Sequence, residues 1–248
     1  MALEIRWTMK RPKKDIAVAG WFLLVVLLLG GASWWTYHEY VSTPPYVDPE
    51  RFPVRGFDIS SHNGYANLEA ASRAGFDFVF IKASEGSDFR DENFALNYQK
   101  ARHAGLKVGA YHYFRFDRDG VEQAVNFLKV VGPRSLELGL AVDVEEAGNA
   151  RGVPLDSVKA RLQLMLEYLN LRGHRVTLYS NRAGYEKYLL DDFRGLPLWV
   201  CQFTDNSANT DWTYWQYDHR GAVPGVRGNV DLNVFAGTRE DWERHFRQ

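Results

Sequence analysis

From Val54 onward the chain alternates short apolar runs with amphipathic segments, and this alternation constrains its fold more than any other feature. The apolar runs are rich in aliphatic residues and bounded by glycine or polar residues, which is typical of buried strands. Strands are expected at 54–59, 78–82, 107–114, 138–145 and 175–179. Helices are expected after them at 68–74, 91–104, 121–131, 154–171 and 185–190. Such alternation predicts an α/β fold with a parallel sheet and right-handed crossovers.

The last third of the chain changes this rhythm. Three more strand-like runs, at 196–203, 213–217 and 228–235, follow one another without a good helix between them. The total of eight strands can close as a barrel, with an irregular final third. Active sites of such barrels lie at the C-terminal ends of the strands. Functional residues are therefore expected at the ends of several strands.

The N-terminal segment 16–37 carries no charged residue and is long enough to cross a bilayer as a helix. Basic residues precede it, and no Lys or Arg follows until Arg51, which places the N-terminus on the cytoplasmic side. We therefore expect a cytoplasmic segment 1–15, a transmembrane helix 16–37, a proline-containing linker 38–53 and a domain 54–248. The domain is expected outside the cytoplasm, in the periplasm or on the cell-wall side.

A cleaved signal peptide is the alternative interpretation of this segment. Gly30, Gly31 and Ala32 are small residues of the kind that a signal peptidase requires. The apolar stretch runs on through Trp34, Trp35 and Tyr37, which favours a retained anchor in contact with inner-membrane lipid.

Charge and cysteine content limit the partners of the chain. The formal net charge is −1, which gives no indication of a nucleic-acid partner. The single cysteine, Cys201, cannot form an intrachain disulfide. Its apolar neighbours predict a small buried residue and not a nucleophile.

A pair of acids stands at the end of the fourth predicted strand. Side chains alternate along a strand, so Asp143 and Glu145 leave the same face, while Glu146 points the other way. Two steps of strand rise separate the pair by roughly 6.5–7 Å along the backbone. Two carboxyl groups in one cavity can cleave a glycosidic bond, since one stays protonated while the other is ionised. A solvated strand end would show the same short pattern.

The other predicted strands also end in polar residues, which favours a shared site. These residues are Asp58, Glu85, His112, Tyr179, Gln202, Gln216 and Asp231. Closure of a barrel makes its first and last strands neighbours, so Asp58 and Asp231 are expected to be close. Carboxylates packed together raise one another's pKa.

Five segments in order carry a resemblance to glycoside hydrolase family 25, the Chalaropsis-type lysozymes. They are 56–64, 78–86, 109–114, 141–145 and 230–235. The resemblance covers roughly 54–237 and implies a flattened TIM-like barrel of five strand–helix units followed by three strands. It also implies an N-acetylmuramidase that cleaves the β-1,4 bond between N-acetylmuramic acid and N-acetylglucosamine in peptidoglycan glycan strands. Cleavage would proceed with retention, and neither a metal nor an organic cofactor is implied.

The resemblance also suggests residue roles. By position, Glu145 matches the general acid/base of the family, Asp143 its partner, and Asp58 and Asp231 the further acids of the cleft. Two departures concern substrate preference: the sequence from Trp199 to Phe203 replaces a Trp-x-Ala-x-Tyr pattern, and Asn67-Leu68 replaces Asp-Trp.

For several side chains the sequence leaves open whether they bind substrate or pack in the core. For five aromatic residues, stacking on a sugar and core packing are equally compatible with the sequence: Tyr111, Tyr113, Tyr179, Trp199 and Trp215. Gln216 is a candidate hydrogen-bond partner for an acetamido group, and Lys82 is expected to be a structural ion-pair partner of the acids.

Three questions stay open at the level of sequence. Asp143 either orients the substrate acetamido group, which we favour, or acts as the nucleophile. A zinc or manganese site is a weaker alternative, because His62 and His112 lack a tight ligand spacing. A membrane-tethered, catalytically inactive wall-binding module is the other alternative. The chain is expected to be monomeric.

Overall fold

The computed structural model describes residues 25–27, 29–31, 33, 44–204 and 211–246. The chain divides into two compact units, Met1–Thr43 and Pro44–Gln248, and the described residues of the first unit are helical. Across the described residues, no helix combines the length and the apolar character that a membrane span requires. The expected span at 16–37 falls mostly outside the described residues.

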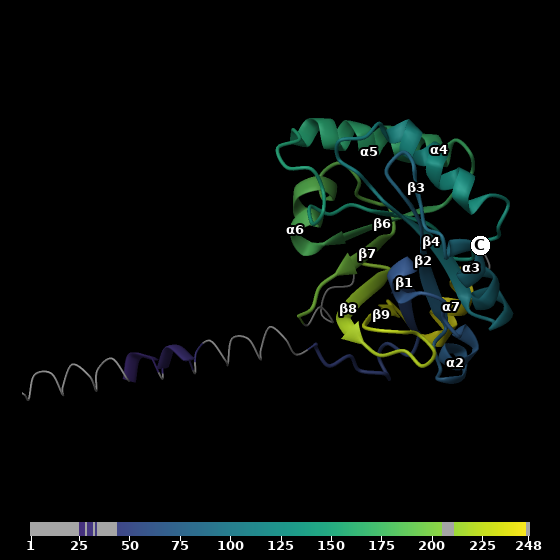
Figure 1. Cartoon of the computed structure of the whole chain (residues 1–248), viewed down its shortest axis with the longest axis vertical. Helices are drawn as coiled ribbons and strands as arrows, with labels where there is room; N and C mark the ends of the chain where they lie inside the picture. Colours follow the sequence, from purple (N-terminus) through teal and green to yellow (C-terminus); the bar gives the residue numbers. More distant parts are fainter. Residues whose placement is uncertain (1–24, 28, 32, 34–43, 205–210, 247–248) are drawn as a thin grey trace, which may run out of the picture. The chain divides into compact units, whose positions relative to one another are not determined.

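Eight strands of the second unit close into a barrel (Figure 1). They are β1 (Arg55–Ile59), β2 (Phe78–Glu85), β4 (Lys107–Tyr113), β5 (Gly139–Asp143), β6 (Val176–Asn181), β7 (Leu198–Cys201), β8 (Tyr214–Gly221) and β9 (Val230–Phe235). Closure is complete because β1 pairs with both β2 and β9. A further short strand, β3 (Phe89–Arg90), pairs only with β2 as a hairpin and was not predicted. The predicted α/β barrel of eight strands is confirmed.

The strand directions are mixed. Neighbours from β1 through β2 and β4 to β8 run parallel, whereas β9 is antiparallel to both β8 and β1. A parallel pair needs a long crossover, usually a helix, and the connection 222–229 contains none. The reversal turns the first residues of β9 towards the end of the barrel where the other strands finish.

Helices cover part of the outside of the barrel (Figure 1). They are α2 (Leu68–Arg73), α3 (Phe94–His103), α4 (Gly120–Val131), α5 (Leu155–Asn170) and α6 (Arg182–Gly184), which continues as the π-turn η2 (Tyr185–Leu189); a 3-10 turn, η1 (Ser61–Asn63), follows β1. Asp119 caps α4 by accepting a 3.0 Å hydrogen bond from the Glu122 amide. Gly120 lets α4 approach α5 closely, because a Cβ there would lie 1.9 Å from the Arg161 carbonyl oxygen. The apolar face of α5 is buried against the barrel, as its periodicity predicted.

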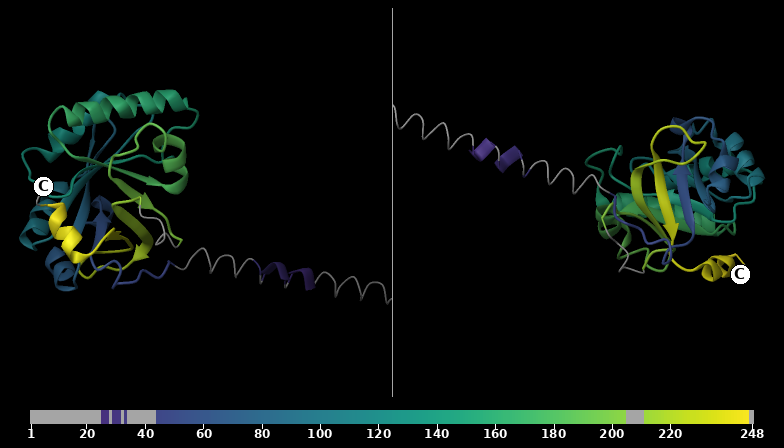
Figure 2. Two further views of the ribbon diagram at one scale, coloured as in Figure 1. Left: turned by 180° about the vertical axis from the view of Figure 1, so that it is seen from behind. Right: turned by 90° about the horizontal axis from the view of Figure 1, so that it is seen from below.

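The barrel interior is filled by aromatic side chains. Phe80 stacks on Trp199 with ring centroids 4.4 Å apart. A terminal helix that was not predicted, α7 (Arg239–His245), lies beside the C-terminus (Figure 2). Its Trp242 packs against Phe78 and Phe235, near the start of β2 and the end of β9. The N-terminal end of the barrel is therefore closed, and space remains at the opposite end.

Residues 44–53, which the sequence placed in a linker, contact the barrel. Phe52 is only 6% exposed. Its ring lies 5.5 Å from that of Trp212 and 6.2 Å from that of Trp215. These contacts cover the outer face of β7–β9, where no helix packs among the described residues.

Candidate active site

The C-terminal ends of the strands surround a cavity of about 200 Å³, which we call the catalytic cavity. It is lined by Asp58, Ser60, His62, Lys82, Tyr111, Tyr113, Asp143, Glu145, Tyr179, Trp199, Gln216 and Asp231. The four acids predicted from three strands thus share one cavity. Five of the six candidate substrate-binding residues line it with them, and the exception is Trp215. Ser60 was missed by the sequence analysis, and His62 was considered there only as a metal ligand.

A chain of hydrogen bonds fixes Asp58 at the base of this cavity. Asn233 and Gln216 donate to Asp58 Oδ2 at 2.8 and 2.9 Å. The indole of Trp199 donates to Asn233 Oδ1 at 2.7 Å, and the Tyr179 hydroxyl donates to Gln216 Oε1 at 2.8 Å. The predicted candidates Tyr179 and Gln216 therefore have partners inside the protein.

Asp58 and Asp231 lie opposite each other in the antiparallel β1–β9 pair. Burial, followed by the negative charge of Asp231, raises the pKa of Asp58 well above its usual range, although the two amide hydrogen bonds act against this. Burial also raises the pKa of Asp231, while His219 and a hydrogen bond with Asp58 lower it. The more buried Asp58 is therefore the member of the pair that burial favours most strongly in its protonated form.

Asp143 ends β5, and Glu145 stands two residues further on. The Asn149 amide holds this turn by donating to the Glu145 carbonyl at 2.8 Å. Burial and the charge of Glu145 raise the pKa of Asp143 well above its usual range. Burial and the charge of Asp231 raise the pKa of Glu145, while Lys82 opposes both shifts. One oxygen of Asp143, Oδ1, is buried without a hydrogen-bond partner among the described residues.

Lys82 is the lysine that lines the cavity, and it stands at an irregularity in β2. The pairing of β2 with β4 shifts between Lys82 and Ser84, as in a β-bulge. Lys82 faces the cavity and donates to Glu85 at 2.8 Å, and Arg115 pairs with the same carboxylate at 2.7 Å. Burial raises the pKa of Glu85, but Lys82 and Arg115 outweigh it, and the net pKa is lowered. Lys82 is an ion-pair partner, as expected, but of Glu85.

The aromatic residues of the cavity divide into two groups. Trp199 is 2% exposed and Tyr179 8%, and their rings pack edge to face with centroids 4.7 Å apart. They form the floor of the cavity. Tyr111 and Tyr113 are only partly buried, and Lys82 lies 5.2 Å from the Tyr113 ring centroid. The two β4 tyrosines are therefore the aromatic surfaces that a ligand can reach.

Other strand-end residues lie away from the cavity. His112 is fully buried between β4 and α4, where it contacts Ser84 Oγ at 2.8 Å and Gln123 Oε1 at 3.3 Å. Burial lowers its pKa to about 4, so it is a neutral core residue, and the expectation that it lies in the strand-end site is wrong. Alternation along β4 explains this, because Tyr111 and Tyr113 point inward.

Gln202 and Trp215 also fail to line the cavity. The Gln202 amide donates to Thr204 Oγ1 at 3.0 Å. Trp215 is fully buried on the outer face beside Phe52. Cys201 is buried, as predicted, and burial raises the pKa of its thiol to about 12.

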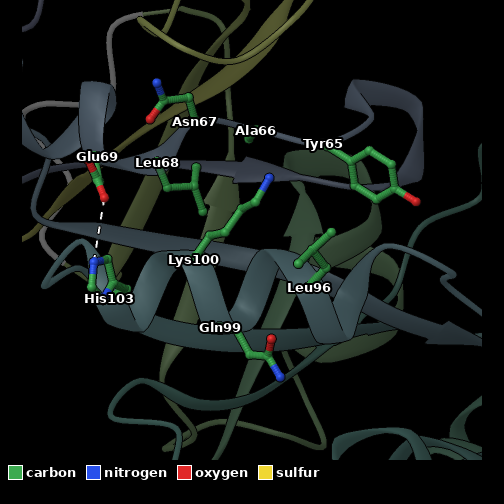
Figure 3. A pocket seen from close by; sticks show the side chains of 9 residues that line it. All are labelled: Tyr65, Ala66, Asn67, Leu68, Glu69, Leu96, Gln99, Lys100 and His103. Carbon is green, nitrogen blue, oxygen red and sulfur yellow. Dashed lines mark ion pairs between the residues drawn. The ribbon is translucent and has the colours of Figure 1, made fainter.

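Two further observations concern the alternatives. Over the part of the chain that the structure describes, no group of three or more His, Cys, Asp or Glu side chains is arranged to hold a metal. A larger cavity, of about 560 Å³, lies between α2 and α3 (Figure 3). Its lining includes the Glu69–His103 ion pair but none of the four strand-end acids. The acids that the sequence indicated for glycosidic bond cleavage therefore lie in the smaller catalytic cavity.

Comparison with known proteins agrees with this assignment. The sequence pattern of Glycosyl hydrolases family 25 matches residues 57–226. The autolytic lysozyme of Clostridium acetobutylicum is 32% identical over 185 residues, which cover 74% of this chain and 56% of that protein. Lysozyme M1 of Streptomyces globisporus is 30% identical over 201 residues, covering 75% of this chain and 68% of that protein. The chain thus spans only about half the length of the first of these relatives.

Solved structures show the same barrel. A family 25 glycosyl hydrolase from Bacillus anthracis superimposes with a TM-score of 0.74 at 30% identity, covering 82% of this chain and 98% of that one. A bacterial lysozyme from Streptomyces coelicolor gives a TM-score of 0.68 at 28% identity, with 78% and 96% covered. With its family pattern matched over more than half its length, and four acids gathered where such barrels carry their active sites, the chain belongs to glycosyl hydrolase family 25.

Proposed function

We propose that this protein is a peptidoglycan hydrolase, an N-acetylmuramidase that cleaves the β-1,4 bond between N-acetylmuramic acid and N-acetylglucosamine with retention. The observation that carries the proposal is the pair Asp143 and Glu145 in one cavity with Asp58 and Asp231. The names of the relatives, lysozymes from Clostridium and Streptomyces, support the same reaction.

Glu145 is the proton donor in this proposal. Its raised pKa keeps the carboxyl group protonated above the usual range of glutamate, so it can protonate the leaving glycosidic oxygen. Once ionised, it takes a proton from the incoming water. Its partly exposed position is compatible with contact to both the sugar and water.

Asp143 orients the substrate acetamido group. Its unpaired Oδ1 is a buried acceptor that an acetamido N–H can satisfy. In the empty cavity Asp143 competes with Glu145 for a proton, because its pKa is also raised. A hydrogen bond from the substrate N–H would favour ionised Asp143 and leave the proton on Glu145. Substrate binding would thus set the protonation states that cleavage requires.

Trapping experiments distinguish this role from that of a nucleophile. Incubation with a slow fluorinated muramoyl substrate analogue, followed by peptide mass spectrometry, should leave Asp143 unmodified. A glycosyl adduct on Asp143 would show that it is the nucleophile.

Digestion of purified sacculi tests the activity itself. The wild-type protein should release soluble muropeptides, whereas Glu145→Gln should bind sacculi without releasing them. Equal release by both proteins would contradict the proposed acid. Binding without release by the wild type would indicate the inactive wall-binding module instead.

We also propose that the N-terminal segment anchors the protein to the membrane, with the barrel outside the cytoplasm. The charge-free segment 16–37 and the preceding basic residues support this arrangement. The protein should fractionate with membranes and keep its N-terminal segment. A shorter soluble form would indicate signal-peptide cleavage.

A further inference from the structure

A second cavity adjoins the catalytic cavity at His62. This second space, of about 320 Å³, is lined by Ser61, His62, Asn63, Gly64, Arg227 and Gly228, and we call it the His62–Arg227 pocket. His62 lines both spaces. A polymeric ligand seated in the catalytic cavity can therefore reach the second cavity past His62.

The walls of the His62–Arg227 pocket are tied to each other. The Asn63 amide donates to the carbonyls of Arg227 and Asn229 at 3.2 and 3.1 Å. The Ser61 amide donates to Asp91 Oδ2 at 2.7 Å, and Ser60 Oγ contacts His62 Nδ1 at 3.1 Å. The turn after β1 and the β8–β9 connection thus form one preorganised unit.

Charge is segregated between the two spaces. The catalytic cavity holds four acids, whereas Arg227 is the only Arg, Lys, Asp or Glu lining the pocket. Arg227 is exposed and forms no ion pair with any residue that the structure describes. A guanidinium without a protein partner is available to bind a carboxylate through two parallel hydrogen bonds.

We propose that the His62–Arg227 pocket binds a carboxylate carried by the muramoyl residue of the substrate, and this proposal rests on the proposed muramidase function. A cavity of about 200 Å³ is smaller than a typical site for a small organic ligand, so substituents of the sugar must lie outside it. The lactyl group of muramic acid is either a free acid or the attachment point of a peptide with free carboxylates. In the pocket such a carboxylate can pair with Arg227, and it lies outside the catalytic cavity with its four acids.

Sedimentation binding in a Glu145→Gln background tests this without consuming the substrate. Two probes carry carboxylates: peptide-bearing sacculi, and amidase-treated glycan that retains only lactyl carboxylates. Two control probes are the same materials after carbodiimide coupling to methylamine, which converts their carboxylates to neutral amides. Arg227→Gln is compared with Arg227→Lys and with Arg172→Gln, an exposed arginine beyond the C-terminus of α5 at the opposite end of the barrel. Thermal melts verify that each variant is folded.

Arg227→Gln should weaken binding to one carboxylate-bearing probe by about fivefold at low salt, as expected for one partly exposed ionic contact. Loss on the peptide-bearing sacculi would identify a peptide carboxylate, and loss on the stripped glycan a lactyl carboxylate. Arg227→Lys should retain most of the affinity, and Arg172→Gln all of it. The coupled probes should bind the Arg227→Gln variant and its parent equally.

Unchanged affinity of Arg227→Gln for both carboxylate-bearing probes would overturn the proposal, as would an equal loss on the coupled probes. Hydrolysis of sacculi by the wild type is scored separately. If the wild type hydrolyses sacculi but Arg227→Gln does not weaken binding, only the pocket assignment is overturned. Absence of both hydrolysis and glycan binding overturns the proposed function and the pocket assignment together.

Discussion

Asp58 on β1 and Asp231 on β9 face each other across an antiparallel strand pair, and their carboxyl groups share a hydrogen bond. The two residues are far apart in the sequence and meet because the last strand closes the barrel against the first. Their contact links the fold directly to the site. It adds negative charge beside Glu145, whose pKa the charge of Asp231 raises after the larger effect of burial.

Replacement of Asp143 by Asn should stabilise the protein at neutral pH while reducing activity. The raised pKa of Asp143 means that the folded state favours the protonated form. Stability from this group is therefore complete below the pKa of the unfolded chain and is lost as pH rises through the folded-state pKa. Asn cannot ionise, so Asp143→Asn avoids the stability that is lost when the buried carboxyl group ionises. We expect a gain of about 1–2 kcal/mol in unfolding free energy near pH 7.

Urea denaturation of both proteins at neutral and at acidic pH checks this prediction. The difference in unfolding free energy between the two proteins should shrink towards acidic pH, where Asp143 itself is neutral. A destabilised Asp143→Asn variant at neutral pH would contradict the assignment of a buried carboxyl group with a raised pKa.

The pH dependence of kcat should report Glu145. Because its pKa is raised, activity should persist above the usual range of glutamate, about 4.3, and then fall as pH rises through the Glu145 pKa. Lys82 lowers this pKa, so Lys82→Met should move the descending limb to higher pH. Glycan-release rates across pH measure both effects. If the descending limb of the Lys82→Met profile moved to lower pH, the proposed electrostatic effect of Lys82 on Glu145 would be refuted.

Asn233 should be a structural support of Asp58. It is fully buried, donates to Asp58 and accepts from Trp199. Asn233→Leu leaves the Trp199 indole N–H without its acceptor and removes one of the two amide hydrogen bonds to Asp58, and we expect a loss of about 2–4 kcal/mol in unfolding free energy. Asn170→Leu, at the exposed end of α5, is the matched control and should change stability by less than about 0.5 kcal/mol. Similar unfolding midpoints for the two variants would count against the network.

The segment before β1 should contribute to the stability of the barrel. Phe52 is buried against Trp212 and Trp215, so Phe52→Ala should cost about 3 kcal/mol. Tyr46, in the same segment, is 82% exposed, and Tyr46→Ala should have almost no effect. Thermal unfolding of the two variants compares them directly. Equal melting temperatures would show that the segment is not part of the folded unit.

The periodicity of the sequence was sufficient to predict the eight strands and the main helices, and closure of the barrel then brought Asp58 and Asp231 together. It was not sufficient to orient every strand-end side chain. His112 was expected in the site, yet it lies on the opposite face of β4 from Tyr111 and Tyr113. Counting alternate residues from these two tyrosines would have found this.

Other features of the site depend on tertiary detail. The register shift in β2 that brings Lys82 and Glu85 together has no sequence signal. Asn233, by contrast, stands two residues after Asp231 on the same strand, so alternation could have placed it beside the acids. The buried position of Phe52 follows from the lack of a helix over β7–β9 within the described part of the chain, which the local sequence around Phe52 does not show.

The most direct test of the central claim is mass spectrometry of the products that purified peptidoglycan yields with the wild type and with Glu145→Gln. The wild type should release fragments with muramic acid at the reducing end, and Glu145→Gln should lower the rate by about 10²–10⁴-fold. Fragments with N-acetylglucosamine at the reducing end, or equal rates for both proteins, would contradict the account.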